Sequence, residues 1–591
     1  MYSNQKTILN PSEVDKLLSK DYKFIKSNKG ISYMNVPVAF DIETTSFYDV
    51  NGNKASIMYA WVFGINGLCI IGRTWDEFKL VLKRVTEYYD LRDNKRIVCF
   101  VHNLAFEFQY LSKQFEWSNV FATDERKPVY AVTGGIEFRC SYILSGYSLA
   151  MVGKNLVKYK VDKMVGDLDY SLIRHNKTPL TDKEYGYILN DGLVVMSYIQ
   201  ELIEEYGDLH KIPLTQTGFV RKYVRCECLY GGIKSHKKNP STKQYRKYRD
   251  LMSTCLIPSY PSYLQMKANY TGGFTHCNAL YNGVVIDDVT SYDFSSSYPA
   301  VMVMEKYPMS TPKLVDVKCL EDFEEMLKYK CCMFNITFYN IRPKLFQDHP
   351  ISYSKCLQSE GVEEDNGRVV KARMITLVLN EVDFSVINDF YEWDNISVWN
   401  MRIMEKGYLP TPFVKAILKL YVDKTALKGL DDIENLTRYM HSKQNLNGCY
   451  GMCVTDVLQL NHTYKDGLWV NETPNIKEVF DKYNNNKSRF LFYPWGVWVT
   501  SYARKNLFMG IQAFGRDYIY SDTDSCKIRN ASKHIEWIDA YNRLVDYKLE
   551  KACKWHNIDI SMVKPKTIKG REKVIGYWDF DGHYKRFKTL G

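Results

Sequence analysis

Several apolar, β-rich runs of this chain end in closely spaced acids. "VPVAF" leads into Asp41 and Glu43, "VTSY" ends at Asp293, and "DYIY" leads into a turn that carries Asp522 and Asp524. In an extended backbone, residues i and i+2 project to the same face. The pattern therefore predicts strands that aim Asp41 with Glu43 at one point and, across a tight turn, Asp522 with Asp524 at another.

Two longer segments follow a helical period. "TDKEYGYILNDGLVVMSYIQEL" carries Tyr187 and Asp191, and "IENLTRYMHSKQNLNGCYG" carries Lys443 and Asn447, with Tyr450 flanking the same face. Residues four apart lie on one side of a helix. The two segments are therefore predicted to be helices that each present polar groups together.

The acids indicate two divalent-metal sites. Carboxylates at one point repel each other unless a divalent cation lies between them, and Mg²⁺ suggests phosphoryl transfer. Glu107, which follows the strand-like "RIVCFV", would join Asp41, Glu43 and Asp191, and four carboxylates can hold two Mg²⁺ ions roughly 3.5–4 Å apart. Taken alone, each N-terminal acid would more often be a solvated surface residue, and "DTD" is as consistent with an exposed hairpin turn as with a metal site.

Composition bounds the class of protein. The chain has 591 residues, which predicts several domains, and a formal net charge of +11, which fits a polyanionic partner without requiring one. The sequence contains no run of 18 apolar residues, so no membrane span is expected, and its polar N-terminal stretch does not resemble a secretory segment. The 15 cysteines are scattered without a C-x-x-C pair, which indicates free thiols in a reducing cytosol.

A basic, tyrosine-rich stretch separates the two groups of acids. Residues 220–248 interleave Lys and Arg with Tyr, a composition that suits a nucleic-acid backbone but equally a solvated linker. "YTGGF" follows at residues 270–274, and its paired glycines would let the backbone approach a ligand closely.

The order of these motifs resembles a known family. "FDIET", "HNLAFE" and "YILND" resemble the three motifs of the 3′–5′ exonuclease domain of family B DNA polymerases, and "YTGGF" resembles the YxGG motif that follows it. "YDFSSSYP", "KQNLNGCYG" and "YSDTDS" resemble the polymerase motifs. With two insertions at the matching places, the chain is similar to protein-primed family B DNA polymerases of bacteriophages.

The resemblance implies an α/β and α+β multidomain fold, in which a ribonuclease-H-like exonuclease domain precedes a family B palm with fingers and two insertions. It assigns residues 1–205 to the exonuclease domain, 206–270 to a basic connector, 271–312 to the first part of the palm, 313–400 to an insertion of the terminal-protein region 1 type, 401–452 to the fingers, 453–492 to an insertion of the terminal-protein region 2 type and 493–591 to the second part of the palm. The family's K-x-Y motif and thumb do not follow Gly591, so either the sequence is a fragment or a second polypeptide supplies the thumb.

The resemblance also implies residue roles. In the exonuclease, Asp41, Glu43 and Asp191 would bind metal, Glu107 would stand where the family has Asp, Tyr187 would orient water, Lys163 would assist, and Thr44, Asn103, Phe106, Ser148 and Leu149 would cradle the single-stranded 3′ end. In the polymerase, Asp293, the Phe294 carbonyl, Asp522 and Asp524 would bind metal, and Tyr270, Gly272, Gly273 and Thr523 would contact DNA. Phe294, Ser296, Tyr298, Lys428, Lys443, Asn447 and Tyr450 would form the dNTP site, with Lys424 nearby; Gly448, where the family has Ser, would admit the nascent base pair more closely.

The implied activity is template-directed DNA synthesis with proofreading, using two Mg²⁺ ions per site that Mn²⁺ can replace. The implied partners are a primer-template, dNTPs and a terminal-protein primer, with no membrane, in the cytoplasm of a bacterial host. Two alternatives stay open: a stand-alone nuclease whose C-terminal half only binds DNA, and a non-catalytic scaffold that holds a terminal protein.

Overall fold

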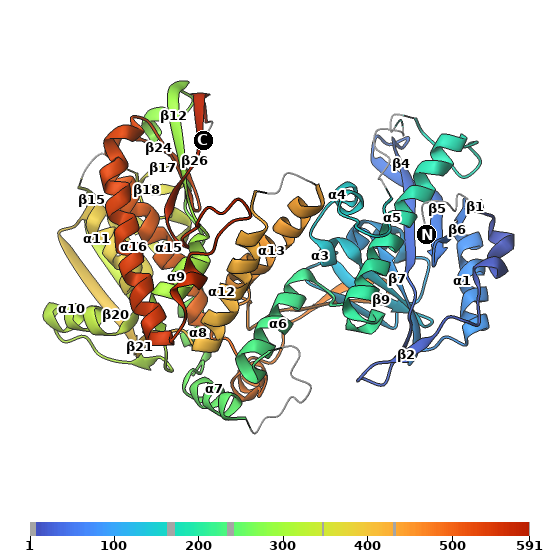
Figure 1. Ribbon diagram of the computed structural model, residues 1–591, viewed down its shortest axis with the longest axis horizontal. Coiled ribbons are helices and arrows are strands. Elements are labelled where there is room, and N and C mark those ends of the chain that lie inside the picture. Colours follow the sequence, from blue (N-terminus) through green and yellow to red (C-terminus); the bar gives the residue numbers. More distant parts are fainter. Residues whose placement is uncertain are drawn as a thin grey trace. The chain divides into compact units, whose positions relative to one another are not determined.

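The computed structural model describes residues 8–161, 169, 172–232, 242–344, 348–429 and 433–589, with the backbone alone for residues 433–438, 440 and 441. Lys163 lies outside this range. The chain forms two compact units (Figure 1). The first contains Met1–Phe219, Asp431–Thr437 and Gln459–Pro474, and the second contains Val220–Leu430, Arg438–Leu458 and Asn475–Gly591.

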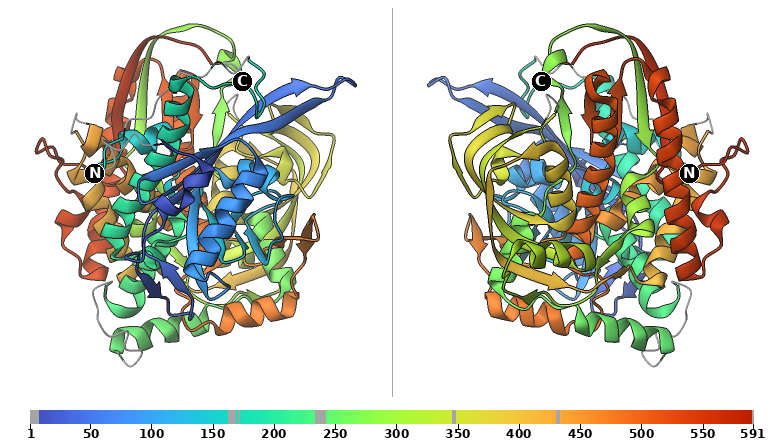
Figure 2. Two further views of the ribbon diagram at one scale, coloured as in Figure 1. Left: turned by 90° about the vertical axis from the view of Figure 1, so that its right-hand side faces the viewer. Right: turned by 90° about the vertical axis from the view of Figure 1, so that its left-hand side faces the viewer.

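The first unit is built on a mixed sheet. Its centre has the order β6 (Leu68–Gly72), β5 (Lys54–Ile65), β4 (Val38–Tyr48), β7 (Lys95–Val101) and β10 (Ile136–Cys140). β5 is antiparallel to β4 and β6, whereas β7 is parallel to β4 and β10 to β7. This is the expected ribonuclease-H-like arrangement. The outer ends of β4 and β5 continue as a two-stranded ribbon (Figure 2).

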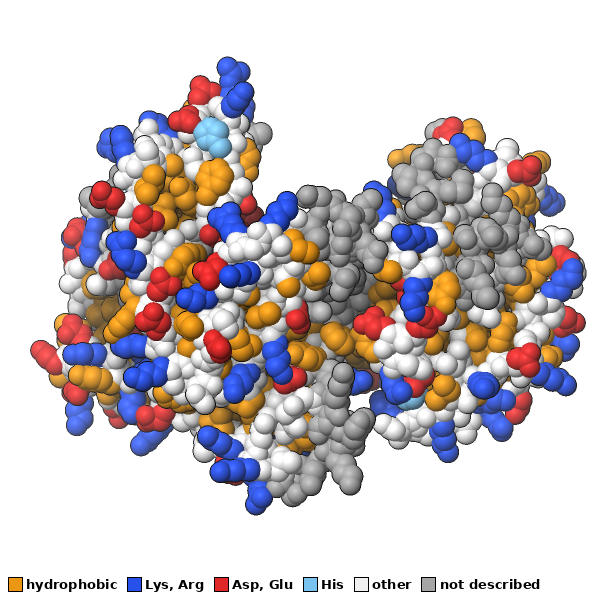
Figure 3. Space-filling view, viewed as in Figure 1, with side chains coloured by type: hydrophobic (Ala, Val, Ile, Leu, Met, Phe, Trp, Pro, Cys, Tyr) orange, Lys and Arg blue, Asp and Glu red, His pale blue; other side chains and the backbone are white. Residues whose placement is uncertain are grey.

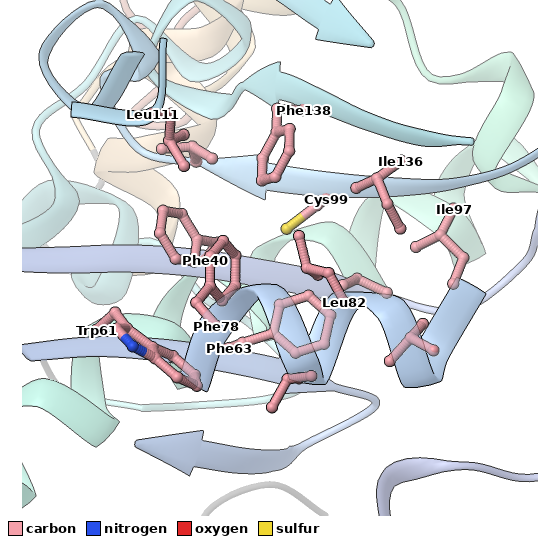
Figure 4. Packing of buried hydrophobic residues seen from close by; sticks show 14 of the residues in the cluster. Phe40, Trp61, Phe63, Phe78, Leu82, Ile97, Cys99, Leu111, Ile136 and Phe138 are labelled. Carbon is pink, nitrogen blue, oxygen red and sulfur yellow. The ribbon is translucent and has the colours of Figure 1, made fainter. Parts of the chain in front are cut away.

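Strand alternation explains how both faces of this sheet are buried. On β5, Trp61 and Phe63 belong to the core that includes Phe78 of α1 (Trp75–Tyr89), as Figure 4 shows. Val62, between them, belongs to a second core with the buried face of α5 (Asp182–Tyr206). Thr74 and Thr181 begin these helices as capping boxes.

A hairpin from a distant part of the sequence completes this sheet. β22 (Asn461–Lys465) and β23 (Leu468–Glu472) pair with each other, and β22 pairs with β8 (Asn119–Ala122) through His462 and Ala122. The rings of Tyr464 and Trp469 lie 5.4 and 5.6 Å from that of Phe108 on α2 (Leu104–Leu111). Part of the segment expected as the second insertion therefore belongs to the first unit.

The second unit contains a five-stranded antiparallel sheet. Its order is β11 (Thr275–Cys277), β24 (Tyr518–Asp522), β25 (Ser525–Ile528), β12 (Ile286–Phe294) and β26 (Trp578–Phe587). The helices α15 (Tyr493–Phe514) and α16 (Ile535–His556) pack against it, and α9 (Ser297–Met304) packs against both of these helices (Figure 2). The Phe294 and Trp578 rings, 4.1 Å apart, join β12 to β26.

The remaining segments of the second unit also have regular structure. A second sheet contains β15 (Cys331–Pro343), β18 (Arg368–Asn380) and β20 (Asn395–Met404), accompanied by α10 (Leu320–Tyr329) and α11 (Glu381–Phe390). α12 (Thr411–Ala426) and α13 (Ile433–Gly451) follow. The stretch expected as a basic connector contains α6 (Gln216–Tyr230), α7 (Lys243–Thr254) and α8 (Tyr260–Asn269), each with a buried face.

All 15 cysteines are free thiols, as expected. Within the described ranges, none of the helices combines the length and apolar character needed to cross a membrane.

Arg504 on α15 joins three segments that lie far apart in the sequence. Its Nη2 lies 2.7 and 2.9 Å from the two carboxylate oxygens of Asp383 on α11, and both side chains are nearly buried. Its Nη1 donates to the carbonyls of Thr271 and Gly272, the latter at 2.8 Å. Ser501 Oγ donates to the same Asp383 carboxylate at 2.7 Å. The pair thus links α15 and α11 to the "YTGGF" segment.

Breaking this pair should destabilise the second unit strongly. We expect Arg504→Met to cost about 3–5 kcal/mol in the free energy of unfolding, because the Asp383 charge stays buried without its partner. The matched control is Arg342→Met, since Arg342 pairs with Glu392 and Asp394 on an exposed surface; that change should cost about 1 kcal/mol or less. Equal costs in denaturant titrations of the two variants would show that the Arg504 pair does not hold the unit together.

Candidate active sites

Three of the four N-terminal acids meet in the first unit. Asp41 and Glu43 on β4 and Asp191 on α5 each offer an oxygen, and these oxygens lie within 4.8 Å of one another. A β-bulge follows at once, because Glu43 pairs with Ala60 but Thr44 pairs with Met58. Bulges bend a strand and re-aim its side chains. The i, i+2 spacing and the bulge together direct the β4 carboxylates toward α5.

Glu107 lies beside this trio. It is nearly buried on α2, hydrogen-bonds with Asp41 and lies close to the Glu43 carboxylate. Burial, reinforced by Glu43, raises the pKa of Glu107 to about 8. Clustered carboxylate oxygens that are partly buried suit a hard divalent cation, whose positive charge would offset the repulsion between them. Asp41, Glu43 and Asp191 therefore fit a metal site, and Glu107 lies beside these three acids.

The predicted DNA contacts of this unit lie at the starts of α2 and α4 and, for Thr44, within β4. Asn103 precedes α2 in a left-handed conformation, with φ of 77°. Ser148 caps α4 (Leu149–Lys154) by accepting from the Met151 amide at 3.4 Å. Phe106 is partly exposed, and Tyr187 is buried on the helix that carries Asp191. Their contacts with a 3′ end, and that of Thr44, remain predictions.

The C-terminal acids meet at one edge of the second unit's five-stranded sheet. Asp293 on β12 pairs in register with Ser525, directly after the turn. The Phe294 amide donates to the Asp524 carbonyl at 2.9 Å, and the Asp524 amide donates to the Asp522 carbonyl at 2.6 Å. Thr523 between the two acids has φ of 58°. The strands and tight turn expected from the sequence are both present, and they bring Asp293 next to Asp524.

Burial disfavours the charged forms of the two acids at this site. Burial raises the pKa of Asp293 to about 7, and the carboxylates of Asp524 and Asp581 reinforce the shift. Burial also raises the pKa of Asp524. Lys443 opposes both shifts, so it lies close to both acids. The uncompensated charge and the oxygen donors fit a divalent cation.

Asp522 and Asp581 occupy different surroundings. Asp522 is exposed, and its Oδ1 accepts from Thr275 Oγ1 at 2.9 Å. Asp581 lies at an irregularity of β26, where its Oδ2 accepts from Ser291 Oγ at 3.2 Å. Sequence reasoning missed Asp581, although Asp579 and Asp581 show the same i, i+2 spacing.

Three predicted tyrosines come together from distant segments. The Tyr298 and Tyr450 rings lie 4.4 Å apart, and the Tyr270 and Tyr450 hydroxyls lie 2.7 Å apart. Lys355, which the sequence did not single out, donates from Nζ to the Tyr270 carbonyl at 2.6 Å. A floor of aromatic rings therefore joins motif residues at positions 270, 298 and 450.

The predicted lysines divide into different environments. Lys424 Nζ donates to Ser296 Oγ at 2.8 Å, and burial with the nearby Lys428 and Lys443 lowers its pKa to about 8. The pKa of Lys428 is lowered by burial and by Lys573. Asn447 and Lys443 on α13 are exposed. Lys424 is thus the lysine in direct contact with a predicted dNTP-site residue.

Two glycines of the predicted motifs lie against other segments of the protein. A Cβ on Gly273 would lie 2.8 Å from Thr523 Cγ2, and the Thr523 amide donates to the Phe274 carbonyl at 2.8 Å. Gly273 therefore makes room for the protein's own "DTD" turn. A Cβ on Gly448 would meet Val220 of α6 at 3.4 Å, an ordinary van der Waals contact. This glycine therefore faces α6, and the closer approach of a nascent base pair stays a prediction.

Comparison with known proteins agrees with this geometry. The family described as DNA polymerase type B, organellar and viral, matches residues 158–468, more than half of the chain. The chain therefore belongs to this family of DNA polymerases, which confirms the predicted family.

Individual relatives point the same way. The DNA polymerase of Bacillus phage Nf is 22% identical over 518 residues, which cover 83% of this chain and 76% of the relative. The DNA polymerase of Bacillus phage phi29 is 23% identical over 448 residues, covering 73% of this chain and 62% of the relative.

Solved structures share the fold. Phi29 DNA polymerase complexed with primer-template DNA has a TM-score of 0.63 at 18% identity, covering 94% of this chain and 85% of that one. The same protein complexed with single-stranded DNA has a TM-score of 0.62 at 18% identity, covering 94% and 86%. These matches confirm the predicted multidomain α/β and α+β fold.

Filling the space beside Gly273 should disturb the polymerase acids. We expect Gly273→Ala to reduce primer extension by up to about 100-fold, because displacement of the "DTD" turn by a fraction of an ångström misplaces Asp524. Adding Thr523→Gly should restore part of the rate, since glycine suits the positive φ of that position. Gly186→Ala, on an open helix face, is the control. A Gly273→Ala enzyme with the unaltered rate would contradict the role assigned to this contact.

The buried acids should make the metal-free protein less stable at high pH. Raised folded-state pKa values for Glu107 and Asp293 mean that the folded chain binds more protons than the unfolded chain between about pH 4 and 8. In EDTA, the free energy of unfolding should therefore fall as pH rises from 5 to 8. Mg²⁺ should restore about 2.7 kcal/mol at 100 times its Kd, chiefly at pH 8.

Thermal unfolding at both pH values, with and without Mg²⁺, tests this. Glu107→Gln should flatten the pH dependence of the first unit and Asp293→Asn that of the second, because each removes one titrating group. A metal-free protein that gains stability between pH 5 and 8 would show that these carboxyls are not protonated in the folded state.

Proposed function

We propose that this type B DNA polymerase extends DNA primers on a template at the Asp293–Asp524 site and removes 3′-terminal nucleotides at the Asp41–Glu43–Asp191 site. The observation that carries the polymerase assignment is the hydrogen bond between the Phe294 amide and the Asp524 carbonyl, which joins the strand of Asp293 to the acidic turn. It supports a shared binding point for the two buried acids.

In synthesis, the bond between the primer 3′ oxygen and the α-phosphorus of a dNTP forms, the bond to the β-phosphate breaks, and pyrophosphate leaves. Asp293, Asp524, Asp522 and the Phe294 carbonyl would hold Mg²⁺ ions, which when bound supply charge neutralisation and activation of the hydroxyl. Lys443 and Lys424 place cations beside these acids and Ser296 for the triphosphate.

The remaining pocket residues position the nucleotide. The Tyr298 ring, supported by Tyr450, forms a rigid floor for the sugar and would collide with a 2′-hydroxyl, which selects deoxynucleotides. Tyr450 is held in turn through the Tyr270 hydroxyl. Gly272, Gly273 and Thr523 border the same turn and are proposed to contact the primer-template.

In the exonuclease reaction, water attacks the terminal phosphodiester and a nucleoside monophosphate leaves. Asp41, Glu43 and Asp191 would hold divalent ions there, and Tyr187 would orient the water. Glu107, which is hydrogen-bonded with Asp41, would help to position that carboxyl group. Thr44, Asn103, Phe106, Ser148 and Leu149 would hold the unpaired 3′ end.

We further propose that synthesis begins on a terminal protein, in the cytoplasm of a bacterial host. The relatives from Bacillus phages support this. The β15–β18–β20 sheet with α10 and α11 would contact the terminal protein, and the β22–β23 hairpin would contact DNA. The domain ranges given above are part of this proposal.

Primer extension followed by dNTP withdrawal tests both activities. With a singly primed template, dNTPs and Mg²⁺, we expect extension and then 3′ shortening once dNTPs are removed. Asp524→Asn should reduce extension by more than about 100-fold, the loss typical of one electrostatic group at a reacting centre, and leave shortening intact. Asp41→Asn is the matched reverse variant, expected to lose shortening and keep extension.

Each alternative predicts a different result. Shortening without extension would favour the stand-alone nuclease. Neither activity, together with no Mg²⁺-dependent dNTP binding, would favour the scaffold. An Asp524→Asn variant that still extends primers would show that the polymerase site is assigned to the wrong residues.

A further inference from the structure

The helical segment between the two groups of acids carries a surface hollow outside both candidate active sites. Its volume is about 770 Å³, within the range of about 300–1,000 Å³ typical of ligand pockets. The hollow lies between α7, the end of α6 and the end of α14 (Ile476–Asn485), all in the second unit. Its lining includes Tyr230, Tyr245, Arg249, Asn485, Lys487 and Ser488.

The wall of this hollow combines aromatic rings with positive charge. The Tyr230 and Tyr245 rings lie 6.0 Å apart with an interplanar angle of only 10°. α7 carries four cationic side chains and one acid along its 12 residues, and Lys and Arg side chains gather over it in Figure 3. Lys419 neutralises the Glu227 carboxylate on α6 at 2.9 Å. The surface beside the rings is therefore basic.

Hydrogen bonds hold these groups in place, and among the described residues these bonds use neither the aromatic faces nor the Lys487 ammonium. Gln244 Nε2 donates to the carbonyls of Glu227 and Cys228 at 2.7 and 2.9 Å, which fixes α7 to α6. Tyr245 Oη donates to the Lys487 carbonyl at 3.3 Å, and Arg249 Nη1 donates to the Asn486 carbonyl at 3.0 Å. The hollow is thus preorganised, so little side-chain entropy is lost when it is occupied.

We propose that this hollow binds a single-stranded nucleic-acid segment, with bases against the Tyr230–Tyr245 pair and phosphates beside Lys487 and the cations of α7. Rings that stack on bases and cations that track a backbone are the means by which proteins bind single strands without reading sequence. The segment comes from either the unpaired template or a displaced strand, and the hollow offers the same chemistry to both.

Binding of the full chain to three labelled DNAs in EDTA tests the proposal without depending on either catalytic activity. The DNAs are a blunt duplex, the same duplex with a 5′ template overhang, and the same duplex with a displaced single-stranded flap. We expect the overhang or the flap to tighten binding at least about fivefold over the blunt duplex, from stacking of one base or more. Whichever DNA shows the gain identifies the strand.

The matched variants separate stacking from packing. Tyr230→Leu with Tyr245→Leu should abolish the gain, whereas Tyr230→Phe with Tyr245→Phe should keep it, because phenylalanine keeps the ring. Lys487→Gln should reduce the slope of log K against log salt concentration for overhang or flap binding by about one. Lys554→Gln, at an exposed position of α16, should leave that slope unchanged. No gain for the original chain, or the same gain in the leucine variant, would overturn the proposal. Primer extension by the original chain would in that case leave the proposed function standing.

Discussion

The buried ion pair between Arg504 and Asp383 sets the framework around the Asp293–Asp524 site. A charge removed from water must keep its partner, so the three segments that meet at Arg504 are held at fixed positions. One of them is the backbone of Gly272, next to Gly273, whose missing side chain leaves the space that Thr523 occupies. The acidic turn therefore takes its position from a contact made by α15, α11 and the loop that contains Gly272.

Both candidate sites solve the same electrostatic problem on unrelated sheets. One places Asp41 and Glu43 beside a bulge in β4, and the other places Asp522 and Asp524 at the turn after β24. Each draws another acid from a separate element, Asp191 from α5 and Asp293 from β12. Without a cation, burial and the neighbouring carboxylates raise the pKa values of Glu107 and Asp293, which favours their protonated forms. The same burial that disfavours the free carboxylates makes the sites attractive to a divalent ion.

Local periodicity was enough to predict much of this arrangement, and contact between distant segments accounts for the rest. Strand alternation predicted Asp41 with Glu43, and turn chemistry predicted the fold-back at Thr523. No local signal could place Lys355 on the Tyr270 carbonyl, 85 residues away, or Arg504 on the Gly272 carbonyl, 232 residues away. Nor could a local signal place Gly448 against Val220, which lies on another helix.

The β22–β23 hairpin bears on how the chain is made. Its strands continue the N-terminal sheet beyond β8, yet they are synthesised more than 300 residues later. Until residue 472 leaves the ribosome, β8 is a sheet edge with unpaired backbone groups, and such edges recruit other strands. Most of the second unit must emerge in that interval. During translation the nascent N-terminal unit would therefore be vulnerable to aggregation, and a chaperone covering that edge would protect it.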